Sequence, residues 1–331
     1  MLQQTRADTV VPYFKRFMKR FPSLRSLARA PRRDVLKLWE GLGYYARARN
    51  AQDAAKFLTE HFCGEFPRTR EGLLSLPGIG GYTAAAIGSL ALGLDLAVVD
   101  GNVIRVLSRV MGYEGDPTSS AGKKILQGWA DSFLIPGKAG LSNESVMELG
   151  ALVCTPRNPA CNECPLQGVC KAFARGNPEQ YPVKKKKEKV PHKIVGAGVV
   201  VGRDGRLLIA QRKETSMLGG LWEFPGGTLE KGETMPECIC RELKEELGID
   251  AEIGPQLLVV HHAYSHFTID LHVHWARITK GRPRVIHCAA FAWVTPAGMK
   301  KYPFSKADLQ IVQCLEKCRG NFPRIGQFAV G

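Results

Sequence analysis

The sequence has no uninterrupted apolar run of membrane-spanning length, and it is poor in acidic residues. It contains 31 Asp and Glu against 46 Lys and Arg in 331 residues, for a net charge of +15. A membrane helix needs about twenty consecutive apolar residues, so an integral membrane protein is not expected. The first residues, MLQQTRADTV, have no apolar core, so no signal peptide is predicted and a cytoplasmic location is expected. The basic charge indicates a polyanionic partner.

Cysteines are present and clustered. Four of the ten lie within seventeen residues, spaced Cys154-x6-Cys161-x2-Cys164-x5-Cys170. In a reducing compartment such a cluster indicates metal ligation and not disulfides. The spacing suits a 4Fe–4S cluster. A structural zinc site is the alternative, although zinc sites more often pair two Cys-x2-Cys units, and only one occurs here.

The hydrophobic periodicity changes along the chain. Residues 1–180 show helical spacing, with helices expected at 9–18, at 35–39 after an N-cap at Asp34, and at 143–153. The run KKKKEK at Lys184–Lys189, between two prolines, predicts a basic linker at 181–192. Beyond it, strand-like segments and one helix predict an α+β domain at 193–320 and a tail at 321–331; the strands are expected at 194–201, 206–211, 256–261 and 268–276, and the helix at 235–247.

The stretch 76–109 combines a glycine-rich hairpin, a helix and one acid. Gly78 and Gly80 can leave backbone N–H groups bare in front of a helix that is expected from about Thr83 to Gly93, a suitable place for a DNA phosphate. A short apolar run then precedes Asp100 and a further helix. Taken alone, the stretch is equally consistent with a loop, a core helix and an aspartate that caps a helix.

The cysteine spacing resembles the iron–sulfur loop of the endonuclease III superfamily of DNA glycosylases. Within it, WEGLGYY at 39–45, LPGIGGYTA at 76–84 and VDGNVIRVLSR at 99–109 resemble the MutY family of adenine DNA glycosylases. Endonuclease III has a lysine nucleophile where this chain has Tyr82. The resemblance therefore implies an all-α helix-hairpin-helix domain with monofunctional glycosylase activity and without a lyase step.

The resemblance also implies a role in base-excision repair. The expected substrate is double-stranded DNA that holds adenine opposite 8-oxoguanine or guanine, and a monomer is expected. Asp100 would stabilise the sugar cation, with Tyr82 and Asn102 supporting it. The other assignments are Glu144 to the adenine pocket, Gln4 and Tyr44 to the base stack, and Gly78, Gly80 and Thr83 to the DNA backbone.

One departure concerns the general acid. In the family this is a glutamate two residues before a methionine that corresponds to Met1 here. A late start codon, a fragment or an inactive form would each account for this, and the first is favoured because the downstream motifs are intact. As given, the chain lacks the family's first helical segment, and we expect weak DNA binding and very slow or absent adenine excision.

The second domain carries two further motifs. The segment from Gly227 to Ile249 fits the Nudix box at every fixed position, which places Glu242, Glu245 and Glu246 on one helix face, where they could hold Mg²⁺. The segment at 262–266, HAYSH, resembles the family's loop that reads 8-oxoguanine; it assigns lesion contact to Ser265, with His262, Tyr264 and His266 around it.

Three alternatives stay open at this stage. A Nudix pyrophosphohydrolase for nucleotide diphosphates such as 8-oxo-dGTP, with a vestigial glycosylase domain, is supported by the complete box and the displaced acid. A non-catalytic lesion-binding protein is supported by the displaced acid alone. An endonuclease III-like lyase is disfavoured by Tyr82 and by the second domain.

Overall fold

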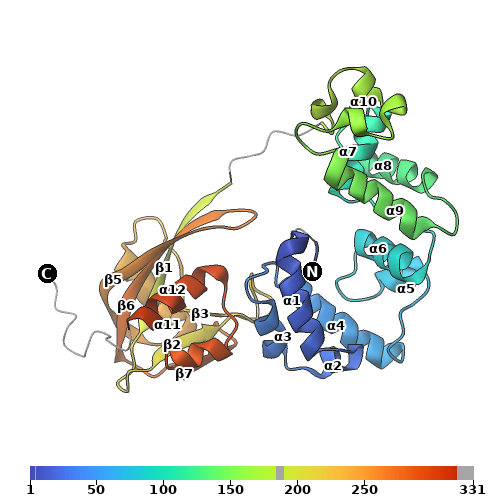
Figure 1. Ribbon diagram of the computed structural model, residues 1–331. Coiled ribbons are helices and arrows are strands. Elements are labelled where there is room, and N and C mark those ends of the chain that lie inside the picture. Colours follow the sequence, from blue (N-terminus) through green and yellow to red (C-terminus); the bar gives the residue numbers. More distant parts are fainter. Residues whose placement is uncertain (4, 184–189, 319–331) are drawn as a thin grey trace. The chain divides into compact units, whose positions relative to one another are not determined.

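The computed structural model describes residues 1–3, 5–183 and 190–318 (Figure 1). Gln4, the lysine run Lys184–Lys189 and the tail predicted at 321–331 lie outside the described residues. Contacts divide the chain into two compact units: unit 1 combines residues 1–56 with those from 189 onward, and unit 2 comprises residues 57–188. In the described ranges, no helix has the length and apolar character that crossing a bilayer requires.

Unit 1 begins with short helices that share one core. They are α1 (Ala7–Arg20), α2 (Leu24–Arg29), α3 (Arg32–Trp39) and the first turns of α4 (Ala46–His61). Val35, Leu36 and Trp39 of α3 are buried there. The N-cap predicted at Asp34 is wrong: α3 starts at Arg32, three residues before the expected start, with Pro31 as its N-cap. Asp34 lies in its first turn, where a carboxylate interacts favourably with the helix dipole.

The remainder of unit 1 contains two sheets. A four-stranded sheet has the order β4-β1-β6-β5 and a three-stranded sheet the order β3-β2-β7. Only β1 and β6 run parallel among the paired strands of these sheets in the described chain. The strands are β1 (His192–Val200), β2 (Leu207–Gln211), β3 (Trp222–Glu223), β4 (Gly226–Thr228), β5 (Asp250–Ala263), β6 (Thr268–Lys280) and β7 (Ala290–Val294).

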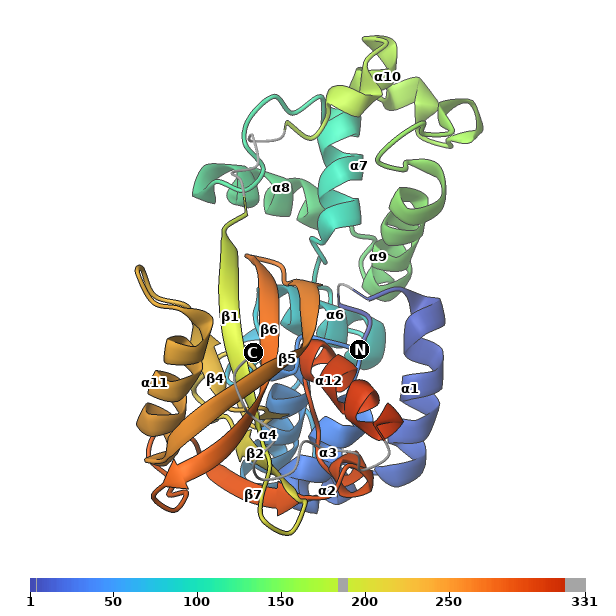
Figure 2. The same ribbon diagram turned by 90° about the vertical axis from the view of Figure 1, so that its left-hand side faces the viewer.

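Two helices cover opposite faces of β1, as Figure 2 shows: α11 (Met235–Leu247) and α12 (Lys306–Lys317). Alternate strand residues face opposite sides, so Ala197 and Val199 share a core with α12, and Val200 shares one with α11. A Cβ added at Gly196 would lie 2.9 Å from Cγ1 of Ile239, so the glycine lets α11 approach the strand closely. The predicted α+β domain is therefore confirmed.

The N-terminal helices contact this α+β region within unit 1. Tyr45 donates its hydroxyl to the Phe304 carbonyl at 3.1 Å, and Glu40 accepts the Phe304 N–H at 2.8 Å. Leu221 is buried in the core of the N-terminal helices. These contacts explain why residues 1–56 group with the residues after 189. The domain boundaries at 180 and 193 stay a prediction from the sequence.

All regular elements in the described residues of unit 2 are helices, joined by loops (Figure 1). Its helices are α5 (Arg70–Leu74), α6 (Gly81–Leu92), α7 (Gly101–Met111), α8 (Ser120–Ser132), α9 (Ala139–Glu148) and α10 (Lys171–Ala174), with short 3-10 turns at Cys161–Glu163, Gln167–Val169 and Pro178–Gln180. Val103 and Leu107 of α7 pack with Leu126 of α8 in its core. The helix predicted at 143–153 is two elements, because a π-helical turn at Leu149–Val153 follows α9.

Candidate functional site

The glycine hairpin leads directly into α6. Gly78 has φ +71°, a conformation that favours glycine, and the N–H of Ile79 closes the turn on the Leu76 carbonyl at 3.1 Å. Gly80 is the N-cap of α6 and, lacking a side chain, makes no side-chain cap. A Cβ at Gly80 or Gly81 would meet nothing within 4 Å. The space next to Gly80 and Gly81, at the start of α6, is therefore open; anion binding there stays a prediction.

Tyr82 lies in this first turn and lines a cavity with about 780 Å³ of empty space, part of it open to solvent. The cavity is bordered by Val99, one residue before Asp100, and by Gln127 and Asp131 of α8. Partial burial, together with the charge of Asp100, raises the pKa of the Tyr82 hydroxyl. The structure thus brings the predicted Tyr82 and Asp100 into electrostatic contact beside one cavity.

Asp100 is the N-cap of α7. Its Oδ1 accepts the backbone N–H of Val103 at 2.8 Å, and its Oδ2 accepts the side-chain amide of Asn102 at 3.3 Å. These two donors fix the carboxylate at the start of the helix, where the helix dipole also stabilises its charge. Asp100 therefore caps the helix and is also hydrogen-bonded to Asn102, so the two interpretations from the sequence do not exclude each other.

Arg105 connects this carboxylate pair to the cysteine loop. It donates to Oδ1 of Asn102 at 2.8 Å and to the backbone carbonyl of Cys154 at 2.7 Å. A Cβ added at Gly150 would lie 2.7 Å from Cβ of Asn102, so the glycine lets the π-helical turn approach α7. A continuous set of hydrogen bonds thus runs from Asp100 through Asn102 and Arg105 to Cys154.

Arg109, one turn later on α7, is 1% exposed. It donates to Sγ of Cys154 at 3.2 Å and to the carbonyls of Thr155 and Pro178, each at 2.8 Å. Neither arginine was singled out from the sequence. The signal in the sequence was a pair of arginines four residues apart in a helix of mostly apolar residues. An arginine buried in such a helix needs several hydrogen-bond acceptors from other segments.

The four predicted cysteine ligands line a single cavity, together with Val106, Arg109 and Leu166, and all four are free thiols. Burial and the neighbouring Cys154, Cys170 and Cys164 raise the pKa of the Cys161 thiol. Among the described residues, no group of three His, Cys, Asp or Glu side chains is arranged to hold a metal ion. Four thiols around one cavity form a donor set that an iron–sulfur cluster takes.

Glu144 lies on α9 with its side chain exposed. Its buried neighbour Asn143 makes the connections that the sequence did not reveal. The Asn143 amide accepts the N–H of Val98 at 3.0 Å and donates to the carbonyl of Leu96 at 2.8 Å, and it also donates to Ser89 of α6 at 2.9 Å. Asn143 therefore holds the segment that leads into Asp100.

The predicted lesion loop lies between β5 and β6 in unit 1. The hydroxyl oxygens of Tyr44 and Ser265 are 2.7 Å apart, so one donates to the other. Tyr44 has φ +48°, a strained backbone conformation for a bulky residue, and Arg47 lies over its ring at 5.3 Å. The ring of His262 meets that of Tyr264 edge-on at 4.6 Å. His266 is exposed. Two residues that were predicted for DNA contact, far apart in the chain, are thus in direct contact.

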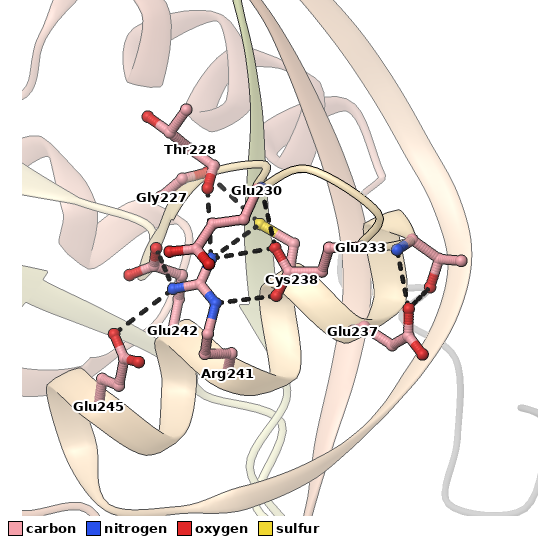
Figure 3. Close-up of polar contacts among 10 residues, drawn as sticks. Gly227, Thr228, Glu230, Glu233, Glu237, Cys238, Arg241, Glu242 and Glu245 are labelled. Carbon is pink, nitrogen blue, oxygen red and sulfur yellow. Dashed lines mark hydrogen bonds and ion pairs between the residues drawn. The ribbon is translucent and has the colours of Figure 1, made fainter.

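Arg241 organises the Nudix box, and Figure 3 shows it among the surrounding acids. It donates to Glu233 at 2.8 Å, to Glu242 at 2.8 Å and to Glu245 at 3.4 Å. These hydrogen bonds lower the pKa of Glu233, whereas burial and the neighbouring Glu242 raise the pKa of Glu246 to about 7. Oε2 of Glu246 is buried and has no hydrogen-bond partner. The three predicted magnesium ligands are therefore on one helix, but two of them are directed to Arg241.

Comparisons with known proteins agree with this arrangement. Family models match at residues 1–131 (HhH-GPD superfamily base excision DNA repair protein), 154–170 (iron-sulfur binding domain of endonuclease III) and 196–314 (NUDIX domain). The predicted order of domains, a helical glycosylase domain, an iron–sulfur loop and a Nudix domain, is thus confirmed.

Full-length relatives extend the match across both parts of the chain. An adenine DNA glycosylase of Rattus norvegicus is 34% identical over 96% of this chain and 70% of its own length. One from Buchnera aphidicola (subsp. Schizaphis graminum) is 38% identical over 82% and 76%, and that of Homo sapiens is 34% identical over 89% of this chain but only 63% of its own length. The chain belongs to the adenine DNA glycosylases, base-excision repair enzymes that hydrolyse an N-glycosyl bond of DNA.

Proposed function

We propose that this protein excises adenine paired with 8-oxoguanine or guanine in double-stranded DNA, by hydrolysis without a lyase step. One observation carries the proposal: a carboxylate that is held by two donors at the start of α7 follows Val99, which lines a cavity together with Tyr82 of α6. Asp100 would face the positive charge that develops on the sugar as adenine leaves. A charge fixed in advance needs no reorganisation during the reaction, which is why such groups lower barriers strongly.

The neighbouring residues have supporting roles in the proposal. Asn102 orients the Asp100 carboxylate through its 3.3 Å hydrogen bond, and Tyr82 borders the cavity that would receive the extruded adenine. Glu144, exposed on α9, is proposed to contact the adenine. Gly78, Gly80 and Thr83 would present the backbone of the hairpin and of α6 to a DNA phosphate. Tyr82 cannot form the Schiff base that a lysine would form, so the products would be free adenine and an abasic site.

Recognition of the opposing base is proposed for the β5–β6 loop. The Ser265 hydroxyl can both donate and accept, which suits the N7–H and O8 groups of 8-oxoguanine. Tyr44 bonds to Ser265 and is proposed to enter the base stack when DNA binds, with His262, Tyr264 and His266 shaping the loop. Gln4, which is outside the described residues, is proposed for the same stack. Stacking would offset part of the few kcal/mol that base extrusion costs.

We assign a 4Fe–4S cluster to Cys154, Cys161, Cys164 and Cys170, which line one cavity. When bound, the cluster would cross-link the loop that Arg105 and Arg109 anchor to α7. Equal amounts of iron and acid-labile sulfide in the purified protein would support the assignment. Zinc in their place would refute it.

Mg²⁺ binding at Glu242, Glu245 and Glu246 is a narrower proposal, supported by the unpartnered Oε2 of Glu246. A cation there would have to draw Glu242 and Glu245 away from Arg241. Calorimetric titration with Mg²⁺ should give a saturable signal that Glu246→Gln abolishes, and no signal in the unaltered protein would refute the site. A monomer and a cytoplasmic location remain predictions from the sequence.

The decisive experiment compares the rate of adenine excision by Asp100→Asn with that of the unaltered protein. It uses single-turnover conditions and a duplex with adenine opposite 8-oxoguanine. We expect excision to fall at least 10²- to 10³-fold, on the order of the loss of one such electrostatic group, with duplex affinity retained. Asp95→Asn is the matched control, because Asp95 accepts the N–H of Gly137 elsewhere in unit 2.

The outcomes separate the candidate functions. Equal excision by the unaltered protein and Asp100→Asn would refute the role of Asp100. Tight lesion binding without excision would indicate a lesion-binding protein. Phosphate or pyrophosphate release from nucleotides without excision would indicate the Nudix hydrolase that the full-length relatives do not favour.

A further inference from the structure

Arg47 lies in the first turn of α4, and its guanidinium holds the start of the chain. Its Nη1 donates to the carbonyl of Met1 at 2.8 Å and also to that of Gln3. Its Nη2 donates to the hydroxyl of Thr5 at 3.3 Å, and the N–H of Thr5 closes a turn on the carbonyl of Leu2 at 3.3 Å. One side chain therefore fastens the described start of the chain to α4.

The same guanidinium holds the loop that leads into α4. Nη2 of Arg47 donates to the carbonyls of Leu42 and Gly43, at 3.5 and 3.1 Å. Gly43 has φ +75° and Tyr44 has φ +48°, and the second value is strained for a bulky residue. Such strain persists only where the surrounding contacts fix the backbone. Arg47 supplies two of these contacts on the residues directly before Tyr44.

Arg47 also lies against two aromatic rings. Its Cζ is 5.4 Å from the centre of the Trp39 ring and 5.3 Å from that of the Tyr44 ring. Trp39 is buried in the core of the N-terminal helices, whereas Tyr44 is exposed. The exposed ring is therefore held between a cation that rests on the core and the hydroxyl of Ser265, to which Tyr44 bonds at 2.7 Å.

The position of Arg47 is costly for a charged side chain. Arg47 is half-buried, and burial lowers the pKa of its guanidinium. Removing a charge from water costs free energy, and an apolar side chain of similar volume is often at least as stabilising. What an apolar side chain cannot do is hold two separate segments in one arrangement, because that takes the planar fork of donors that arginine provides.

We propose that Arg47 is a positioning residue for base extrusion. It joins residues 1–3, Thr5 and the loop 41–44 into one rigid unit, the N-terminal wedge, which enters the base stack of DNA. This inference rests on the proposed function, in which Tyr44 enters that stack. Extrusion of a base costs stacking and pairing energy. A wedge that is ordered before it binds loses less conformational entropy on entering the stack, so the base leaves the stack faster.

The test measures extrusion directly, on a duplex with 2-aminopurine in place of the adenine opposite 8-oxoguanine. Stacking quenches this analogue, so its fluorescence rises as it leaves the stack. Stopped-flow mixing with a saturating amount of the full chain gives the rate of extrusion. We expect Arg47→Met to lower this rate about tenfold, because methionine fills the space but donates no hydrogen bond, and small displacements of positioning groups are expensive.

Arg49→Met is the matched control. Arg49 lies on the same helix, is also half-buried, and has a pKa that burial lowers, but it donates to the carbonyl of Gly219 at 2.7 Å and not to the N-terminal wedge. Its loss should change the rate of extrusion by less than about twofold, as expected of a residue outside the wedge. A rate that falls equally in Arg47→Met and Arg49→Met would overturn the proposal.

Arg47→Lys separates positioning from charge. A lysine keeps the positive charge, but its single nitrogen cannot serve the carbonyls of both segments, so the rate should fall about threefold or more. A rate equal to that of the unaltered protein would show that the charge alone matters, as in a simple phosphate contact, and would overturn the proposal.

A second duplex guards against a folding defect in Arg47→Met. It carries mismatched pairs on both sides of the 2-aminopurine, so that extrusion from the weakened stack costs less. On this duplex the deficit of Arg47→Met should shrink to less than about threefold, because a wedge is needed least where the stack is weakest. An undiminished deficit would indicate a general loss of structure and would overturn the proposal.

Release of the free base, measured on the same samples, distinguishes failure of this inference from failure of the proposed function. Extrusion that Arg47→Met slows, without release of the base by the unaltered protein, would refute excision and still support the role of Arg47. Release at equal rates by the unaltered protein and Arg47→Met, with equal extrusion, would overturn the role of Arg47 alone. No rise of fluorescence with the unaltered protein would overturn both.

Discussion

Replacement of Arg109 by methionine tests whether this side chain holds the cysteine loop on α7. Methionine is of similar length and apolar, so it fills the space but donates no hydrogen bond. Arg109 is 1% exposed and donates to the carbonyls of Thr155, Pro156, Pro178 and Tyr181 at 2.8, 3.4, 2.8 and 3.2 Å and to Sγ of Cys154 at 3.2 Å. The variant leaves these buried or partly buried acceptors without their donor.

The magnitude follows from the number of acceptors. An unsatisfied buried polar group costs about 1–3 kcal/mol, and these costs are not fully additive. Four carbonyls and one sulfur, most of them only partly buried, therefore predict that the free energy of local unfolding falls by about 3–5 kcal/mol, a large part of the stability of a typical domain. Because 1.4 kcal/mol is a factor of ten, amide hydrogen exchange in the loop should accelerate about 10²- to 10³-fold.

Hydrogen exchange followed by mass spectrometry localises the effect to peptides from residues 154–181. The exchange rates of Arg109→Lys should lie between those of the unaltered protein and Arg109→Met, since a lysine keeps the charge but cannot reach all five acceptors. Arg157→Met is the control, because Arg157 is exposed on the same loop and its loss should change stability by less than about 0.5 kcal/mol. Exchange rates in Arg109→Met that match those of Arg157→Met would refute the reasoning.

Other consequences can be measured on the same protein. The pKa of Glu246 is raised to about 7 in the fold, so burying this group as an acid has no electrostatic cost at low pH. As pH rises from about 4.5 through 7, the unfolded state releases the proton first and the free energy of unfolding falls. Urea unfolding at pH 5 and pH 8 should show that Glu246→Gln removes about 1–3 kcal/mol of this pH-dependent fall. Tyr44→Phe removes the hydroxyl that bonds to Ser265 and should change the ratio of 8-oxoguanine to undamaged duplex affinity about threefold to tenfold; an unchanged ratio would show the contact to be irrelevant for reading. Gly150→Ala places a Cβ 2.7 Å from Cβ of Asn102 and should slow single-turnover excision more than it weakens DNA binding.

Local signals made some elements predictable to the residue. Helix α11 was expected at 235–247 and spans Met235–Leu247, because a capping box between Thr234 and Glu237 starts it and Gly248, at φ +69°, ends it. The end of α6 at Gly93 has the same cause. Strands β3 and β4 were not predicted, since two and three residues are too few to show an alternating pattern.

The candidate site was predictable as separate motifs but not as a connected arrangement. The cysteine spacing and the resemblance identified Asp100, Asn102 and the four thiols. They did not reveal Arg105, Arg109 or Asn143, whose partners lie about 45 residues away or more in sequence. Contacts of this kind depend on how helices pack, and the local pattern of one sequence carries no record of that packing.

The two interpretations of Asp100 that the sequence left open turn out to support each other. A carboxylate that caps a helix is fixed by the Val103 N–H, and a fixed carboxylate is what stabilisation of a sugar cation requires. The two functions are separable, because asparagine caps a helix about as well as aspartate, whereas alanine costs about 1 kcal/mol. Asp100→Asn should therefore keep the stability of unit 2 and lose excision, and Asp100→Ala should lose both. If Asp100→Asn lost stability as Asp100→Ala does, the charge itself would be structural, and this would count against Asp100 as the carboxylate that stabilises the sugar cation.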